Sequence, residues 1–225
     1  MPQTKLFPIG EAHMRSLSLI TKRLLATIIF AIVLFSNVGY STAYDSDAAV
    51  SYAYAHWNSY NSGYAHYSSD CANFVSQCLH EGGIAMRESG NDQWFMKRVL
   101  LVFWSHSNSW TVAYDLGEYI KDNSWCDMVR YYASISTLGT YENFTEKGDV
   151  VRYYFGYKNN PNYHTALVTQ DTWLNGTRIT QHSTDRLDVF INYTSNESGT
   201  NTPILDYSQR AATSCEIYCM DSAIS

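Results

Sequence analysis

The stretch SSDCANFVSQCLHEGG, residues 68–83, predicts a short helix that begins at a cysteine. Asp70 is the expected N-cap, and Gly82-Gly83 is a strong signal for the end of the helix. At 3.6 residues per turn, one face carries Cys71 together with the apolar residues Phe74, Val75, Cys78 and Leu79. The polar residues fall on other sides of the helix: Asn73, Ser76, Gln77 and His80. Cys71 therefore starts the stripe that we expect to be buried.

A thiol in the first turn of a helix has two possible uses. The positive end of the helix dipole and the unpaired backbone N–H groups favour the thiolate, which is the nucleophilic form, and they can also stabilise an oxyanion. Asp70 partly offsets this effect by placing a negative charge beside the sulfur, unless backbone donors occupy its carboxylate. The alternative is a core cysteine, because a free cysteine is often simply buried. The helix alone leaves both alternatives open.

The N-terminal segment has the pattern of a secretory signal peptide. Basic residues precede the apolar run LLATIIFAIVLF, residues 24–35, and Ser41-Thr42-Ala43 forms a small-x-small cleavage signal. The run is short for a membrane span, so an uncleaved anchor is the second choice. We expect residues 1–43 to be removed, which leaves 11 basic and 20 acidic residues and changes the net charge from −6 to −9. An acidic chain of this kind is not expected to bind nucleic acid or anionic membranes electrostatically.

Beyond the signal peptide, the pattern predicts an α+β domain in which helices come first and an antiparallel sheet follows. YDSDAAVSYAYAHWNSYN and TVAYDLGEYIKDN have helical periodicity, whereas GDVVRYYFGY, YHTALVTQ and GTRITQHS are short β-branched and aromatic segments. We place the domain at residues 44–190. Residues 191–225 are a C-terminal extension whose membership of the domain the sequence leaves open.

The five cysteines do not predict a metal site or a disulfide framework. An odd count leaves at least one thiol unpaired or paired between molecules, and Cys215 and Cys219 lack a second pair with zinc-like spacing. We expect no metal and no other cofactor. Nothing in the sequence indicates an oligomer, and we expect a monomer.

A catalytic cysteine needs a base, and His164 is the best placed histidine. It begins the strand-like segment HTALVT, where a side chain would overhang the edge of the sheet. His182 ends the following strand, with Asp185 shortly after it. A tight Asn175-Gly176 turn would place His164 opposite Leu187 and nearest to Asp185, whereas a wider loop would place it opposite His182. The sequence does not decide between these two registers.

These motifs resemble the putative amidase domain family, a papain-like group related to CHAP and NlpC-type peptidoglycan hydrolases. The resemblance runs from about Tyr44 to Asp188 and is carried by DCANFVSQCLHEGG, Trp94, KGDVVRYY, HTALVTQ and HSTDR. It implies a papain-like fold with the nucleophile at a helix N-terminus and the base on the sheet.

Position by position, the resemblance implies that Cys71 is the nucleophile, His164 the base and His182 the third, orienting residue, with Asp185 as the alternative for that role. Tyr67 matches a position from which relatives supply a hydroxyl to the oxyanion or substrate. Other matching positions on the helix indicate structural hydrogen bonds: Asn73, Ser76 and Gln77.

The predicted function is an exported cysteine amidase or peptidase that hydrolyses amide bonds in peptidoglycan or related peptides. We expect a secreted protein, with association with the cell wall as an option, that meets the membrane only through its signal peptide. The rival prediction is a non-catalytic papain-like module that binds peptides or proteins and buries or cross-links Cys71. Acyl transfer is a third option, because water and an amine can each take the acyl group from a thioester.

Overall fold

The computed structural model describes residues 43–100, 102–133, 145–155, 162–172, 176–191 and 212–220. The predicted signal peptide lies outside these residues except for Ala43. All the described elements belong to one compact unit, Ser41–Ser225. Within the described residues, no helix has the length and apolar character needed to cross a membrane.

Four helices come from the first half of this unit. α2 spans Ser46–His56, and Asp45 caps it by accepting a hydrogen bond from the Ala48 amide at 3.0 Å. α3 spans Cys71–Glu81 and ends at Gly82, as the sequence predicts. The helix predicted around residues 111–123 is divided at Val112 into α4, Asn108–Thr111, and α5, Ala113–Asp122, because Val112 has an extended backbone.

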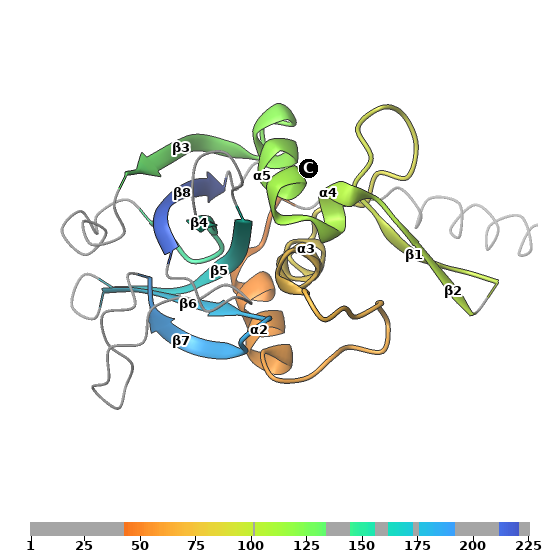
Figure 1. Ribbon diagram of the computed structural model, residues 1–225, viewed down its shortest axis with the longest axis horizontal. Coiled ribbons are helices and arrows are strands. Elements are labelled where there is room, and N and C mark those ends of the chain that lie inside the picture. Colours follow the sequence, from red (N-terminus) through yellow and green to blue (C-terminus); the bar gives the residue numbers. More distant parts are fainter. Residues whose placement is uncertain are drawn as a thin grey trace, which may run out of the picture. The chain divides into compact units, whose positions relative to one another are not determined.

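The strands form a six-stranded antiparallel sheet in the order β3-β8-β4-β5-β6-β7 (Figure 1). The strands are β3 (Cys126–Tyr132), β4 (Val150–Phe155), β5 (Asn162–Thr172), β6 (Gly176–Gln181), β7 (Arg186–Phe190) and β8 (Ala212–Met220). A separate hairpin pairs β1, Met96–Val99, with β2, Phe103–His106.

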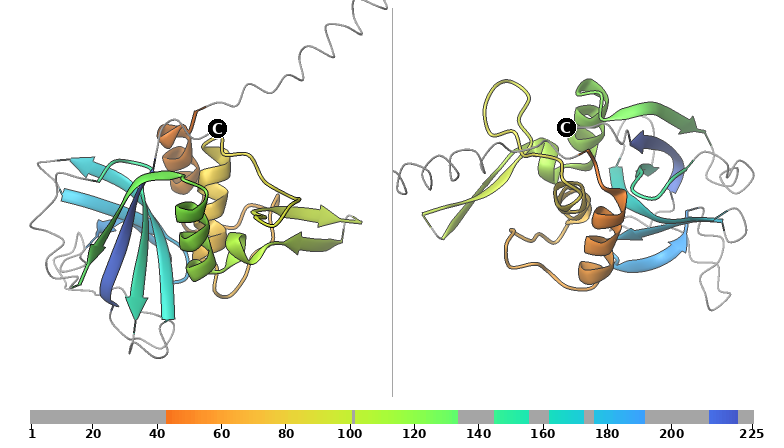
Figure 2. Two further views of the ribbon diagram at one scale, coloured as in Figure 1. Left: turned by 90° about the horizontal axis from the view of Figure 1, so that it is seen from above. Right: turned by 180° about the vertical axis from the view of Figure 1, so that it is seen from behind.

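The helices pack on one face of the sheet (Figure 2). The two faces of the sheet carry separate apolar clusters. On the helical side, Phe74 and Leu79 of α3 belong to the same cluster as Val150 of β4 and Leu167 of β5. On the opposite side, the cluster comes from the sheet and from Ile191, which follows β7. Side chains alternate between the two faces along a strand, so consecutive residues of β5 contribute to different clusters.

The predicted α+β class with an antiparallel sheet is confirmed, but four parts of it were not predicted. One is β7, which follows the last strand that the sequence predicted. The β1–β2 hairpin and β3 lie in a region for which the sequence predicted only one helix. β8 lies beyond residue 190 and is nevertheless inserted between β3 and β4. The sheet therefore includes part of the segment that the sequence pattern set apart as an extension.

Candidate active site

Cys71 is the first residue of α3, and its side chain is 5% exposed. Asp70 is the N-cap residue of this helix, as the sequence predicts, but its carboxylate makes no capping hydrogen bond. Its Oδ1 instead accepts from the Tyr67 amide at 2.9 Å and from Asn73 Nδ2 at 2.8 Å, and its Oδ2 lies 2.8 Å from His182 Nδ1. The Asp70 side chain therefore leaves the N–H groups of the first turn to other acceptors.

A buried polar network holds the same helix in place. Asn73 Nδ2 also donates to the Ala65 carbonyl at 2.8 Å, and Asn73 Oδ1 accepts from Trp110 Nε1 at 2.8 Å. Ser76 Oγ donates to the Trp110 carbonyl and accepts from Trp94 Nε1, and the Tyr52 hydroxyl donates to Gln77 Oε1. The predicted structural hydrogen bonds are confirmed. These polar residues are buried too, so the helix has no solvated face along most of its length.

His164, near the start of β5, and its neighbour Thr165 lie beside the Cys71 thiol. Burial alone raises the pKa of this thiol, but the charge and hydrogen bond of His164 lower it. The backbone and side chain of Thr165 act in the same direction, and the pKa ends below its ordinary value. The Thr165 hydroxyl is buried and has no geometrically strict hydrogen-bond partner among the described residues. Sequence reasoning missed Thr165, although its position directly after the predicted base is a usable signal.

The rest of the His164 ring is enclosed by aromatic side chains. It stacks on Tyr153 at 6.2 Å between ring centroids and meets the edge of Phe155 at 6.4 Å, and the residue is 4% exposed. Its Nε2 atom has no hydrogen-bond partner among the described residues. The described part of the chain therefore provides no orienting partner at this nitrogen.

His182 does not meet His164, because both of its ring nitrogens are used elsewhere. Nδ1 lies 2.8 Å from Asp70 Oδ2, and Nε2 lies 2.7 Å from the His56 carbonyl oxygen. In the structure Leu167 of β5 pairs with Thr180 of β6. This pairing differs by one residue from the register expected with the wider loop, in which His164 would lie opposite His182. A one-residue shift places a side chain on the other face of a sheet, which explains why the expected contact is not formed.

The two remaining predicted site residues contact other parts of the molecule. Asp185 is exposed in the turn after β6. The Tyr67 ring is half-buried and meets the edge of His106 at 5.6 Å, while its amide binds Asp70. The structure therefore brings together Cys71 and His164, and it attaches His182 to the residue that precedes the cysteine.

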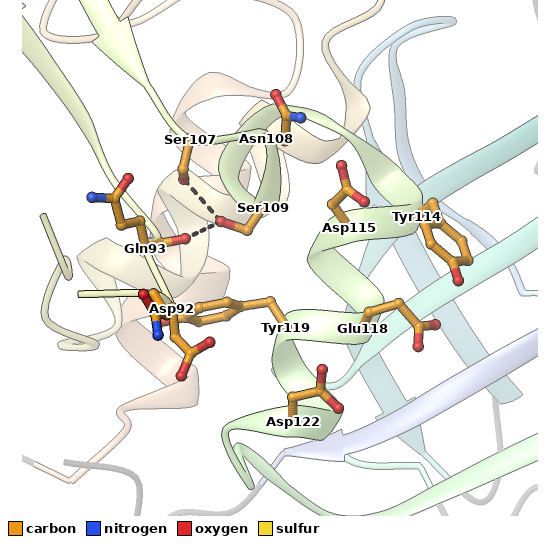
Figure 3. A pocket seen from close by; sticks show the side chains of 11 residues that line it. Asp92, Gln93, Ser107, Asn108, Ser109, Tyr114, Asp115, Glu118, Tyr119 and Asp122 are labelled. Carbon is orange, nitrogen blue, oxygen red and sulfur yellow. Dashed lines mark hydrogen bonds between the residues drawn. The ribbon is translucent and has the colours of Figure 1, made fainter. Parts of the chain in front are cut away.

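A cavity of about 450 Å³ lies beside α5, away from these residues (Figure 3). It does not include Cys71 or His164 in its lining, which is polar and carries four carboxylates: Asp92, Asp115, Glu118 and Asp122. One of them, Glu118, is paired with Lys121 and Arg152. Across the described ranges, no group of three or more histidine, cysteine, aspartate or glutamate side chains could hold a metal ion. The predicted absence of a metal stays a prediction.

Residues 43–205 match the Putative amidase domain family, which is well over half of the chain. The chain belongs to this family. It is also 35% identical over 136 residues to a Bacillus subtilis (strain 168) protein named "Uncharacterized protein YhbB". That alignment covers 59% of this chain and 40% of the relative, so the chain spans about two-fifths of the length of that relative. No solved structure matches the chain. The name of the putative amidase domain family indicates amide hydrolysis in general.

Proposed function

We propose that this putative amidase domain is a papain-like, exported cysteine amidase or peptidase that hydrolyses amide bonds in peptidoglycan or related peptides. The observation that carries the proposal is the thiol of Cys71, which begins α3 beside His164 and has a lowered pKa. A nucleophile needs an adjacent base and a depressed pKa, and a merely structural cysteine needs neither. Cys78 of the same helix has a raised pKa and provides the contrast.

The reaction begins when the Cys71 sulfur attacks the carbonyl carbon of the amide. The C–S bond forms as the carbonyl π electrons move to oxygen, and the N–H groups of the first turn of α3 stabilise the resulting oxyanion. Because the Asp70 side chain does not cap this turn, it does not compete with the oxyanion for those donors. The hydroxyl of Thr165 and its backbone assist at the sulfur before attack by favouring the thiolate.

His164 carries the proton through both halves of the reaction. As an imidazolium it gives a proton to the amide nitrogen, so that the C–N bond breaks and the amine leaves. As a neutral imidazole it then takes a proton from water, whose oxygen attacks the thioester and releases the carboxylic acid and the thiol. The stacking of its ring on Tyr153 limits how far it can rotate between these steps.

Export and the choice of substrate rest on the sequence. The basic flank, apolar run and small-x-small ending of residues 1–43 support a cleaved signal peptide and a secreted enzyme. Peptidoglycan or a related peptide follows from the resemblance to CHAP and NlpC-type hydrolases. Within this proposal the chain acts alone as a monomer and without a cofactor.

The test is to incubate the purified chain with soluble peptidoglycan fragments and to identify newly freed amines and carboxylates by mass spectrometry. We expect Cys71→Ala to reduce cleavage by about a thousandfold or more, because no other group can form the thioester. Cys78→Ala is the matched control and is expected to retain cleavage. Equal activity in the Cys71→Ala variant would contradict the mechanism. An unreactive Cys71 together with tight binding of the fragments would favour the non-catalytic binding module.

A further inference from the structure

His182 and Asp70 are buried together directly before the proposed nucleophile. Asp70 is 1% exposed and His182 is 3% exposed, and the His182 ring stacks on Phe74 of α3 with 4.1 Å between ring centroids. The Asp70 amide also donates to Ser183 Oγ at 2.6 Å. The turn after β6 is therefore fastened to the start of α3 by two separate contacts.

The partners of the His182 ring determine its protonation state. The His56 carbonyl oxygen can only accept a hydrogen bond, so Nε2 must carry a hydrogen. Asp70 accepts two N–H groups at Oδ1, which is the pattern of an ionised carboxylate, and an ionised Oδ2 can only accept, so with Asp70 ionised the Nδ1 that faces it carries a hydrogen as well. A ring with hydrogens on both nitrogens is an imidazolium.

We infer that His182 is held as an imidazolium by Asp70 and the His56 carbonyl, and that this pair positions the start of α3 and cancels the charge that Asp70 would place beside Cys71. The inference rests on the proposed function, because it assigns His182 a positioning role at the same thiol. It also replaces the expected contact of His182 with His164 by a contact on the other side of the cysteine.

The surroundings of His182 agree with a cationic ring. Burial alone would lower its pKa, but the hydrogen bonds to Asp70 and to the His56 carbonyl, with the charges of Asp70 and Asp185, raise the pKa above its ordinary value. Tyr60 meets the ring edge-on at 5.5 Å. The titratable groups that face His182 from the neighbouring segments are then Asp70, Asp185 and Tyr60, whereas His56 meets it through its backbone carbonyl.

Nitrogen NMR of the wild-type chain at pH 6.5 tests the charge directly and needs no variant. A free histidine is about half neutral at this pH. We expect both ring nitrogens of His182 to give signals that are predominantly of the protonated type. A ring with one protonated and one bare nitrogen, next to a protonated Asp70, would overturn the inference.

Alkylation of Cys71 by iodoacetamide, measured against pH and located by peptide mass, tests the effect on the thiol. His182→Gln leaves Asp70 uncompensated, so we expect the apparent pKa of Cys71 to rise by about 1, with about tenfold slower labelling below that pKa. Asp70→Asn is expected not to raise it. In the double variant, Asn and Gln can keep the hydrogen bonds without charges, so we expect the pKa to return to within about 0.3 of the wild-type value.

The matched control is His80→Gln, the same substitution at a histidine that belongs to α3 itself, where we expect no change in Cys71 labelling. If Cys71 is labelled as slowly in the double variant as in His182→Gln, His182 acts through packing alone, and this result would overturn the charge compensation. The labelling and the NMR do not require an amide substrate. If the peptidoglycan fragments are not cleaved but the pKa of Cys71 in the double variant returns to the wild-type value, the proposed function fails and the positioning role of Asp70 and His182 is still supported. If His182→Gln does not fold, the NMR result on the wild-type chain decides.

Discussion

Cys71 and Cys78 lie on the same face of one helix, and both are buried, yet their thiols are opposites in chemistry. The pKa of Cys78 is raised well above its ordinary value by burial, and the charge of Glu81 adds to this. The pKa of Cys71 is lowered despite equal burial, because His164 and Thr165 face it. The neighbours of the sulfur, and its place in the first turn, therefore decide its reactivity, whereas depth in the core does not.

The largest expected effect comes from making Cys71 resemble Cys78. His164→Ala removes the charge and the hydrogen bond that oppose the cost of burying a thiolate, so the pKa of Cys71 should rise above its ordinary value. We expect alkylation at pH 6.5 to be slower by about a hundredfold, as for a thiol whose pKa is higher by about 2. The rate is measured by peptide mass, with Cys78 as the slow internal reference.

His80→Ala is the control for this prediction, because His80 lies on the same helix as both cysteines but bonds to the Ile84 carbonyl. Labelling of Cys71 should be unchanged in that variant. If His164→Ala labels as fast as the wild type, the comparison between the two thiols loses its basis.

The fold could be predicted from the sequence wherever a local signal was strong. Gly82 at the end of α3 is a stop signal that acts within a few residues, and it marks the predicted end. β8 has no such signal. Residues 212–220 form a strand because β3 and β4 present open edges on both sides of them, and that depends on contacts far away in the sequence.

The site could be predicted in its chemistry but not in all of its contacts. The pairing of Cys71 with His164 follows from which residue types can serve as nucleophile and base. The place of His182 depended on a register that shifts at a bulge between Val168 and Gln170, and no residue pattern in GTRITQHS reveals that bulge. In this register His182 contacts Asp70 in place of His164.

The next prediction concerns what fixes the Cys71 end of the helix. Asn73 is fully buried and makes three hydrogen bonds, to the Ala65 carbonyl, Asp70 and Trp110. Asn73→Ala would remove its hydrogen bonds to the Ala65 carbonyl and to Trp110 Nε1 and one of the hydrogen bonds that Asp70 accepts, so we expect a loss of about 2–4 kcal/mol in the free energy of unfolding in urea. Gln77→Ala breaks the hydrogen bond to Tyr52 and should cost about half as much. Equal losses of stability in Asn73→Ala and Gln77→Ala would mean that packing alone, and not the hydrogen bonds of Asn73, holds the Cys71 end of the helix.

The Asp70–His182 pair makes stability depend on pH at the Cys71 end of the helix. The pKa of His182 is raised in the folded chain, so the folded state holds its proton more tightly than the unfolded state does. This contribution is fully present below the ordinary histidine pKa and is lost as the pH rises through the raised one. We expect the free energy of unfolding of the wild type to approach that of Asp70→Asn/His182→Gln as the pH rises over this interval. If the difference in free energy of unfolding between the wild type and the double variant grew with pH, the pKa of His182 would have to be lowered in the folded chain, which would contradict its charge pairing with Asp70.

The smallest effect is expected at Cys78 itself. Cys78→Ala removes one sulfur atom from a fully buried site and leaves a small cavity, so the free energy of unfolding should fall by about 1 kcal/mol. Seven residues of helix separate the two cysteines, about 10 Å at 1.5 Å per residue, so the cavity should leave the contacts of His164 and Thr165 with Cys71 in place. Labelling of Cys71 should therefore keep its rate within about twofold at every pH. A slower Cys71 in a folded Cys78→Ala chain would show that the packing of α3 sets the reactivity of the thiol, and the distinction between the two ends of the helix would have to be abandoned.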